Sequence, residues 1–579
     1  MKRKTISLLL SITMVAATLL SGCGNQQAAQ SGQSGGQTAQ EDAAEDTAGD
    51  TAGEETSADS EQTDSETPGE MITFTFAKVA YPSVTLPDGQ TSDSNVVIDY
   101  IRDKYNVNMV LDWQAESSEY NNKLSMNIAS GSLPDIFYCD NYRTFLQLAQ
   151  NGLLADLTDI YDDNISDTIK AIDASFGGRH MQPVTIDGRL MAIPGGNLDG
   201  SQSVLWLRKD WLDNLGLDVP ETFEELEEVL TAFVNDDPDG NGVDDTEGLV
   251  VNATEPVKAY GNTFGLEPVF YAMGAYPTYW MEDENGEVYY GSTGSKMKDA
   301  LALLHDWYEK GLIDKQFATR IGSGETEAVF TSGQAGAFFG PIHVTAITEA
   351  FTNNPDIELV PVNAPLTADG KFQYVLPAPM SSMLCISSKC ADPARAVEII
   401  GIGNDLYRGF DEEANEIFNA AGIAASSSGR RAIFPQGAVT YDYFDIIETL
   451  GKAVKENIDT GSYTPYEGMT QYDKDQVELA SGYADGSDQS EISFKAYYYR
   501  YVGSALLTDS RIEPLDAAYY YTTDSSPSLQ TELDTLEQEM YLSIIIGDKS
   551  VDYFDEFVEQ WNSIGGETLL NEVNEVLGK

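Results

Sequence analysis

The sequence predicts an α/β fold, in which a mainly parallel sheet carries helices on its faces. Three observations predict it: residues 72–76 alternate apolar side chains with threonine, residues 107–113 form a second strand pattern, and a helical stretch ending at residues 101–105 lies between them. This order is typical of a βαβ unit. The roughly 500 residues that follow the first 70 are too many for one hydrophobic core and suit two or three domains.

The next stretch predicts a helix, a stop and a third strand. Leu124 and Ile128 lie four residues apart on one helix face. Gly131 can end this helix, and Pro134 blocks its continuation before a strand over residues 136–138. The loop after such a strand lies at the carboxyl end of the sheet, where ligands of α/β proteins usually bind.

Two later helices follow from capping and spacing. Thr222 and Glu225 form a capping box at the start of an apolar helix face over residues 223–233. Residues 554–561 have apolar side chains at i, i+3, i+4 and i+7, which favours a core position for Trp561 over a ligand platform.

The first residues resemble the signal peptide of a bacterial lipoprotein. A basic start precedes an apolar run to about residue 20, and residues 20–23 read Leu-Ser-Gly-Cys. These four residues resemble a lipobox, which implies that residues 1–22 are removed and that Cys23 receives acyl chains such as palmitate. Two chains hold a protein on a membrane where one chain binds only reversibly.

Residues 24–70 contain almost no apolar residue other than alanine, and they predict a disordered acidic tether. A flexible chain of this length spans roughly 35 to 40 Å, enough to hold a folded body clear of a membrane. No second long apolar run follows, so the body is not expected to span a membrane.

The composition excludes two further classes of protein. The formal net charge of −61 repels nucleic-acid phosphates, so no nucleic-acid partner is expected. Cys139, Cys385 and Cys390 are too few and too scattered for a disulfide scaffold, and we interpret them as buried free thiols.

Six segments follow the lipobox and tether in a specific order: residues 128–135, 207–212, 237–248, 330–336, 386–393 and 544–550. Together they resemble the extracellular solute-binding lipoproteins of ABC importers, of the family 1 type, and specifically the larger oligosaccharide binders similar to alginate-binding proteins. The resemblance implies a two-lobed, periplasmic-binding-protein-like fold of type II with hinge strands and helical additions. It implies capture of an extracellular carbohydrate, an oligosaccharide, in the interlobe cleft and delivery to a membrane permease.

The resemblance also implies that the chain crosses between the lobes more than once. We expect lobe 1 to comprise residues 71–200 and about 360–410, and lobe 2 to comprise about 201–359 and 411–579. The protein is expected to be a monomer, anchored by lipid on the outer face of a Gram-positive cell membrane.

Residues 237–248 form an acidic loop that resembles a calcium-binding EF-hand loop. Oxygen side chains at loop positions 1, 3, 5 and 9, with a carbonyl at position 7, nominate Asp237, Asp239, Asn241, Asp245 and Val243 as ligands. Position 12 is Gly248, so Thr246 or Glu247 must complete the shell. An acidic turn is the alternative, but its carboxylates would repel one another without a cation, so we expect a structural Ca²⁺.

The loop after residues 136–138 and several glycine-rich positions nominate ligand contacts, because in proteins of this fold such loops face the cleft. The candidates are Tyr138, Asp140, Asn141, Tyr142, Asn197, Tyr260, Phe264, Phe339 and His343. Sugars offer apolar ring faces and hydroxyl edges, which suit aromatic rings beside polar groups. With 31 tyrosines in the chain, part of this set is expected to be packing, and His343 is as readily structural.

Three rival functions remain open. A surface glycan hydrolase would need two carboxylates around the scissile bond, but no nucleophile elbow or His-Glu-x-x-His motif occurs, so no enzyme is expected. A peptide or another small solute is the second candidate ligand for a transport protein. An adhesion or scaffold lipoprotein with the same two-lobed body is the third alternative.

Overall fold

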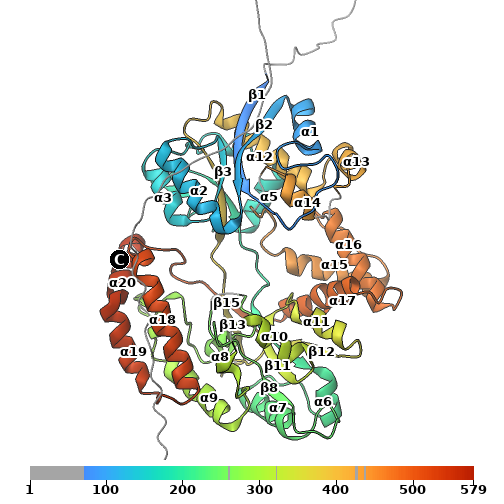
Figure 1. The fold of residues 1–579 in the computed structure, drawn as a ribbon, viewed down its shortest axis with the longest axis vertical. Helices are drawn as coiled ribbons and strands as arrows, with labels where there is room; N and C mark the ends of the chain where they lie inside the picture. The colour runs from blue at the N-terminus through green and yellow to red at the C-terminus, as the bar shows by residue number, and fades with distance from the viewer. Residues whose placement is uncertain (1–70, 259–260, 321, 424–427, 436–438) are drawn as a thin grey trace, which may run out of the picture. The chain divides into compact units, whose positions relative to one another are not determined.

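Two larger β-sheets, each with its own helices, organise the described chain (Figure 1). The computed structural model describes residues 71–579 except 259–260, 321, 424–427 and 436–438. The predicted signal peptide of residues 1–22, the predicted lipidation site Cys23, the predicted tether of residues 24–70 and the ligand candidate Tyr260 lie outside the described residues.

The first lobe is built on a five-stranded sheet in the order β2-β1-β3-β14-β6. Its strands are β1 (Ile72–Val79), β2 (Val107–Ala115), β3 (Ile136–Cys139), β6 (Ile193–Gly196) and β14 (Met380–Ile386). β1 is parallel to β2 and β3, as the βαβ pattern predicts, whereas β14 is antiparallel to β3 and β6. The sheet is therefore mixed. The chain leaves this lobe after β6 and returns to it at β14.

The helices of the first lobe begin and end at residues with clear capping roles. α1 (Val96–Tyr105) begins after Asn95, whose side chain accepts hydrogen bonds from the N–H groups of Val97 and Ile98. α2 (Ser117–Ser130) ends at Gly131, where a φ of 68° suits a residue without Cβ. The other helices are α3 (Tyr142–Gln150), α4 (Tyr161–Asn164), α5 (Asp167–Ser175), α12 (Pro393–Arg408), α13 (Glu412–Ala420) and α14 (Ser428–Ile433).

The second lobe is built on a four-stranded sheet in the order β12-β7-β11-β8. Its strands are β7 (Ser203–Arg208), β8 (Glu247–Leu249), β11 (Ala335–Pro341) and β12 (Leu359–Val362). β7 is antiparallel to β11 and β12, and β11 is parallel to β8. Beside this sheet lie α6 (Lys209–Leu215), α7 (Phe223–Asn235), α8 (Glu267–Ala272), α9 (Met297–Lys310), α10 (Ser323–Thr331) and α11 (Ala346–Asn353). The capping box of Thr222 and Glu225 at the start of α7 is present.

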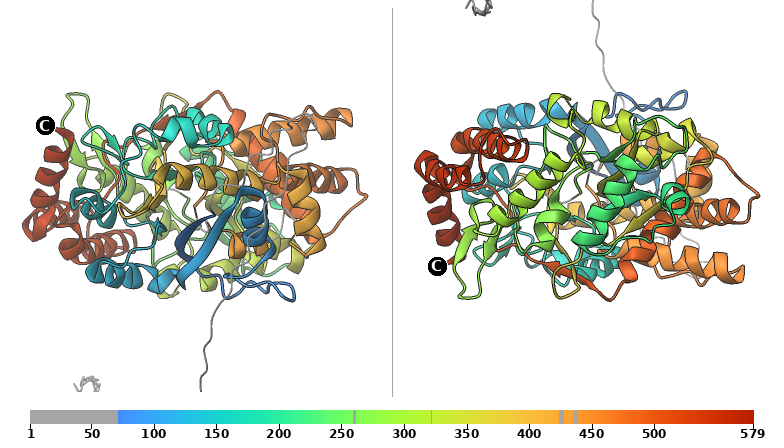
Figure 2. Two further views of the ribbon diagram at one scale, coloured as in Figure 1. Left: turned by 90° about the horizontal axis from the view of Figure 1, so that it is seen from above. Right: turned by 90° about the horizontal axis from the view of Figure 1, so that it is seen from below.

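Helical additions follow the sheets in sequence. They are α15 (Ile446–Thr460), α16 (Gln471–Ala484), α17 (Glu491–Tyr497), α18 (Ser526–Ile545), α19 (Tyr553–Trp561) and α20 (Glu567–Leu577). α18 packs beside α9, and the views of Figure 2 show the C-terminal helices, drawn in red, at one side of the described chain. Phe554, Phe557 and Trp561 are buried in this core, as their spacing predicts.

Small pairs of strands join distant segments. β9 (Trp280–Glu282) pairs with β10 (Val288–Tyr290), and β13 (Phe372–Val375) pairs in parallel with β15 (Ile512–Leu515). A further hairpin joins β4 (Thr185–Ile186) to β5 (Arg189–Leu190).

The hydrophobic cores locate the crossings between the lobes. The first crossing lies near residue 200, since Ile193 belongs to the first-lobe core and Val204 to a second-lobe core. The sequence predicts two further crossings, near residues 360 and 410. The structure instead places them after β13 and after Tyr441. β13 packs in a second-lobe core, and the chain from α12 to Tyr441 packs in the first-lobe core. The apolar pattern of these segments predicts that they are buried, but it does not predict which of the two sheets they pack against, so the crossings could not be placed from sequence.

The three thiols of the described chain, Cys139, Cys385 and Cys390, are buried and unpaired, as expected. Burial raises the pKa of Cys390 to about 11, so its thiol stays protonated at neutral pH. Among the described residues, no helix combines the length and the apolar character needed to cross a membrane.

Candidate functional site

A cavity of about 410 Å³, here called the aromatic pocket, lies where the chain passes between the lobes. It is lined by Asn197, Thr278, Tyr279, Trp280, Tyr290, Pro377, Ala378, Tyr519, Tyr520, Tyr521, Thr522, Ser526, Gln530, Trp561 and Leu569. Asn197, Pro377 and Ala378 come from the segments that cross between the lobes, and the others come from the second lobe. A ligand in this cavity therefore touches both the hinge segments and the second lobe.

One wall of the aromatic pocket is a packed group of rings. The rings of Tyr290 and Trp561 are stacked, with centroids 4.7 Å apart and planes 7° apart. The ring of Trp280 contacts both, with its centroid 5.1 Å from that of Tyr290 and 6.2 Å from that of Trp561. The Tyr290 hydroxyl donates a hydrogen bond to buried Glu537 at 3.0 Å, which fixes the orientation of its ring. Trp280 stays partly exposed, so this wall offers a rigid apolar face to a ligand.

Another part of the lining is a run of three tyrosines, Tyr519, Tyr520 and Tyr521. The Ala518 N–H donates to the Trp280 carbonyl at 2.7 Å, so this run is held beside strand β9. Burial raises the pKa of all three phenols, and they remain neutral hydrogen-bonding groups at physiological pH.

The polar groups of the aromatic pocket include Asn197 and Thr278. The Asn197 side-chain amide donates to the Ala378 carbonyl at 2.8 Å, which ties together two of the segments that cross between the lobes. Thr278 has a φ of 68°, which is unusual for a β-branched residue. Its hydroxyl is buried and has no hydrogen-bond partner within the part of the chain that the structure describes. The strained backbone and the hydroxyl without a partner make Thr278 a candidate ligand contact.

Three contacts join the first lobe to residues 516–524, which include the tyrosine run. Tyr142 of α3 lies with its ring centroid 4.3 Å from that of Tyr521. Arg179 forms an ion pair with Asp516, and Arg143 approaches Asp524 at 4.0 Å. The aromatic pocket is thus bordered by both lobes.

The structure brings two of the predicted ligand residues to the aromatic pocket. Asn197 lines it, and Tyr142 contacts one of its lining rings. Near Tyr142, the Tyr138 hydroxyl donates to Asp140 at 3.2 Å, and Asn141 accepts from the Thr144 N–H to cap α3. These three residues surround the start of α3 but do not line the cavity.

Three other candidates lie elsewhere. Phe264 and Phe339 are completely buried and belong to hydrophobic cores, so they do not reach a ligand. Aromatic residues beside glycine give the same sequence signal in a core as in a binding loop, which explains this correction. His343 is exposed with its ring 6.3 Å from that of Tyr499, and it does not line the aromatic pocket.

Sequence reasoning missed Trp280, Thr278 and the tyrosine run. It also favoured a core position over a ligand platform for Trp561, which is buried as expected but lines the cavity as well. The three consecutive tyrosines are visible in the sequence, and such a run outside any helix pattern is a usable signal. The pairing that brings Trp280 beside Tyr519 links distant segments and leaves no local trace.

The acidic loop of residues 237–248 gathers its oxygen side chains within one turn. The Asn241 amide donates to Asp239 at 2.7 Å and to Asp245 at 3.3 Å, and Asp237 accepts from the Gly242 N–H at 3.0 Å. The loop carboxylates do not form a compact metal-binding group, and among the described residues no cluster of three or more His, Cys, Asp or Glu is placed to hold a metal ion. The predicted carbonyl donor, Val243, has an exposed side chain.

The two candidates for completing the shell interact with residues outside the loop. The Thr246 hydroxyl donates to the Phe233 carbonyl at 2.8 Å and closes the end of α7. Glu247 belongs to β8 and interacts electrostatically with Arg320, while burial raises its pKa. The loop therefore offers Asp237, Asp239, Asn241 and Asp245 as side-chain donors, and water would fill the remaining positions of a bound cation.

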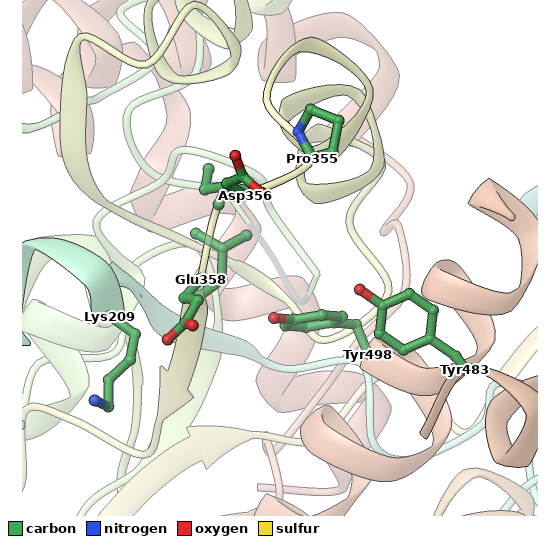
Figure 3. Close-up of a pocket in the computed structure, with 8 residues that line it drawn as sticks. Lys209, Pro355, Asp356, Glu358, Tyr483 and Tyr498 are labelled. Carbon is green, nitrogen blue, oxygen red and sulfur yellow. The ribbon is translucent and has the colours of Figure 1, made fainter. Parts of the chain in front are cut away.

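A second hollow of about 510 Å³ lies on the second lobe alone (Figure 3). It is lined by Lys209, Pro355, Asp356, Ile357, Glu358, Leu359, Tyr483 and Tyr498. Asp356 and Glu358 are exposed, and Lys209 is already paired with Asp213. This open, one-lobed hollow makes no contact with the segments that cross between the lobes, so it suits ligand capture less well than the aromatic pocket.

Residues 88–400 match the family described as bacterial extracellular solute-binding protein. Lipoprotein LipO of Bacillus subtilis is 25% identical over 472 residues, covering 80% of this chain and 85% of LipO. The polygalacturonan/rhamnogalacturonan-binding protein YtcQ of the same organism is 24% identical over 472 residues, covering 78% and 82%. Among solved structures, an EF-hand mutant of the Streptococcus pneumoniae substrate-binding protein FusA with fructo-nystose has a TM-score of 0.55 at 16% identity, covering 87% and 98%. Its likeness confirms the two-lobed fold, and the family match shows that this chain belongs to the bacterial extracellular solute-binding proteins.

Proposed function

We propose that this protein captures an extracellular oligosaccharide in the aromatic pocket and delivers it to the permease of an ABC importer. The observation that carries the proposal is the joint lining of this cavity by rigid rings and by segments that cross between the lobes. The names of YtcQ and FusA, which refer to saccharide ligands, support the carbohydrate class.

The geometry matches the chemistry of a sugar. A pyranose or furanose has apolar C–H faces that pack on rings such as Trp280 and Tyr521, and hydroxyls that need partners such as Asn197 and Thr278. The unpaired Thr278 hydroxyl would gain its missing hydrogen bond from a ligand hydroxyl.

Delivery to a permease requires that the liganded state differ from the free one. A ligand that contacts the hinge residues Asn197 and Ala378 as well as the second lobe favours one arrangement of the lobes over others. The permease would then recognise the arrangement that the ligand stabilises.

Binding without turnover also fits the aromatic pocket. No Asp or Glu is present among its lining residues, whereas a glycoside hydrolase needs two carboxylates about the scissile bond. The protein is therefore proposed to release its ligand unchanged. A peptide or another small solute is a less suitable ligand, because no charged side chain in the lining would hold peptide termini.

A structural Ca²⁺ in the loop of residues 237–248 is part of the proposal. The alternation of oxygen side chains, and the contacts of Asn241 with Asp239 and Asp245, support it. The FusA structure is that of an EF-hand mutant, which is consistent with such a loop in a protein of this fold. Pro238 accepts a hydrogen bond from Asn214 of α6, so a cation that orders the loop would also fix it against this helix.

Lipid attachment at Cys23 would place the protein on the outer face of the cell membrane as a monomer on the tether of residues 24–70. The Leu-Ser-Gly-Cys sequence and the name of lipoprotein LipO support this. The tether keeps the captured solute near the permease.

Isothermal titration of the purified protein against neutral and acidic oligosaccharides tests the ligand class. We expect saturable binding of at least one oligosaccharide, with no new reducing ends after prolonged incubation. Binding of peptides alone, or cleavage of the glycan, would refute the proposal.

A further inference from the structure

We infer that the aromatic pocket selects uncharged oligosaccharides and discriminates against chains of uronic acids. This inference rests on the proposed function and adds the class of sugar. It distinguishes this chain from YtcQ, whose name refers to polygalacturonan and rhamnogalacturonan.

The first observation is the chemistry of the lining. None of the residues that line the aromatic pocket carries a charge: they are aromatic and aliphatic side chains with amides and hydroxyls. Amides and hydroxyls such as those of Asn197, Gln530 and Thr522 pair well with sugar hydroxyls. None of them supplies the positive charge that a buried carboxylate needs.

The second observation concerns two arginines that contact residues 516–524, each of which is already paired. Arg179 forms an ion pair with Asp516, beside the tyrosine run. Arg143 lies between Asp524, at 4.0 Å, and Glu572, whose pKa it helps to lower. A uronate that used either arginine would have to displace a carboxylate of the protein.

The third observation is the state of the phenols and of the whole chain. Burial raises the pKa of Tyr519, Tyr520 and Tyr521, so they add no charge to the cavity. The formal net charge of −61 adds a long-range repulsion against any polyanion that approaches.

These observations favour a neutral ligand on energetic grounds. A carboxylate that enters this partly enclosed cavity loses part of its hydration, and the lining supplies no opposite charge to restore that free energy. A neutral ring of the same shape loses only hydroxyl hydration, which amides and hydroxyls replace.

Trigalacturonate and its fully methyl-esterified form provide a matched pair of ligands, because they share a backbone and differ in charge. Titration of the full-length protein with this pair, and with the neutral trisaccharides kestose and maltotriose, measures the discrimination. We expect at least one neutral trisaccharide to bind, and trigalacturonate to bind at least about tenfold more weakly than its methyl ester, because its carboxylates stay unpaired. The gap should narrow when salt screens the repulsion.

A pair of variants tests whether the lack of positive charge in the lining causes the discrimination against uronates. Thr522→Arg adds a cation at the exposed rim of the aromatic pocket, and Thr522→Gln adds similar length without charge. We expect Thr522→Arg, but not Thr522→Gln, to reduce the preference for the methyl ester by about tenfold, as one new ion pair allows.

The outcomes separate the two proposals. If trigalacturonate binds as tightly as its ester, or more tightly, the neutral selectivity is wrong while oligosaccharide capture stands. If no saccharide of either kind binds, the proposed function fails and this inference fails with it.

Discussion

Tyr142 and Tyr521 are in ring contact, with centroids 4.3 Å apart and planes inclined by 32°. Tyr142 begins α3 of the first lobe, whereas Tyr521 ends the tyrosine run that lines the aromatic pocket. This pair is therefore a direct aromatic connection between a first-lobe helix and the candidate ligand site, close to the ion pair of Arg179 with Asp516.

Tyr521→Ala is expected to weaken oligosaccharide binding by about tenfold, because an aromatic pair contributes roughly 0.5–1.5 kcal/mol beyond its buried area. Titration calorimetry checks this value. Tyr472→Ala is the control, since Tyr472 is an exposed tyrosine of α16 outside the aromatic pocket, and it should bind as the wild type does. A double-mutant cycle with Tyr142→Ala should give a coupling energy of about 1 kcal/mol, and a coupling near zero would mean that the ring contact plays no part in binding.

Thr278→Gly is expected to stabilise the ligand-free protein and to weaken binding. The φ of 68° strains threonine but suits glycine, so unfolding should cost about 1 kcal/mol more in the variant. The variant lacks the buried hydroxyl that we assign to the ligand, so affinity should fall several-fold. Chemical denaturation and calorimetry measure the two effects. A stability increase with unchanged affinity would assign Thr278 to backbone strain alone.

Chelation of calcium is expected to lower the melting temperature. A cation that binds only the folded state at a hundred times its dissociation constant stabilises it by about 2.7 kcal/mol. Asp239→Asn should reduce the response to chelator, whereas Asp548→Asn, an exposed residue outside the loop, should respond as the wild type does. Scanning fluorimetry with calcium and with chelator measures the shift, and equal melting temperatures would identify residues 237–248 as an acidic turn.

Cys23→Ser is expected to release the protein from cells into the medium, because the diacylglyceryl group would have no thiol to join. Immunoblots of cell and medium fractions measure the distribution. Ser57→Ala, which changes only the tether, should leave the protein cell-bound. Retention of Cys23→Ser on the cells would show that another feature anchors the chain.

The sequence predicted those elements whose signals are local. The parallel strands β1 and β2, the stop at Gly131 and the capping box at Thr222 each depend on residues close together in the chain. The aromatic pocket instead depends on the bridge between Trp280 and Tyr519, for which no short-range pattern exists. For the same reason Asn197 was found from its turn before the hinge, whereas Phe264, with the same kind of glycine neighbour, turned out to be in a core.

Glu267 predicts a pH-dependent stability that is independent of the ligand. It is buried at the start of α8, where it accepts hydrogen bonds from the Lys258 N–H and the Asn262 amide, and one carboxyl oxygen has no partner in the described chain. Burial raises its pKa to about 7 from the ordinary 4.5, so between these values the folded state holds a proton that the unfolded state has lost. The stabilisation is complete below pH 4.5 and is lost as the pH rises to about 7.

Glu267→Gln removes this titration, and the comparison of the two proteins isolates it. Relative to the variant, the wild type should lose about 3 kcal/mol of unfolding free energy between pH 4.5 and pH 7, given 1.36 kcal/mol for each pKa unit. Urea denaturation at several pH values measures the difference. Asp548→Asn should leave the pH profile unchanged, because Asp548 is exposed. Parallel profiles for wild type and Glu267→Gln would mean that the carboxylate is ionised in the folded protein at an ordinary pH, with solvent or a cation reaching its second oxygen.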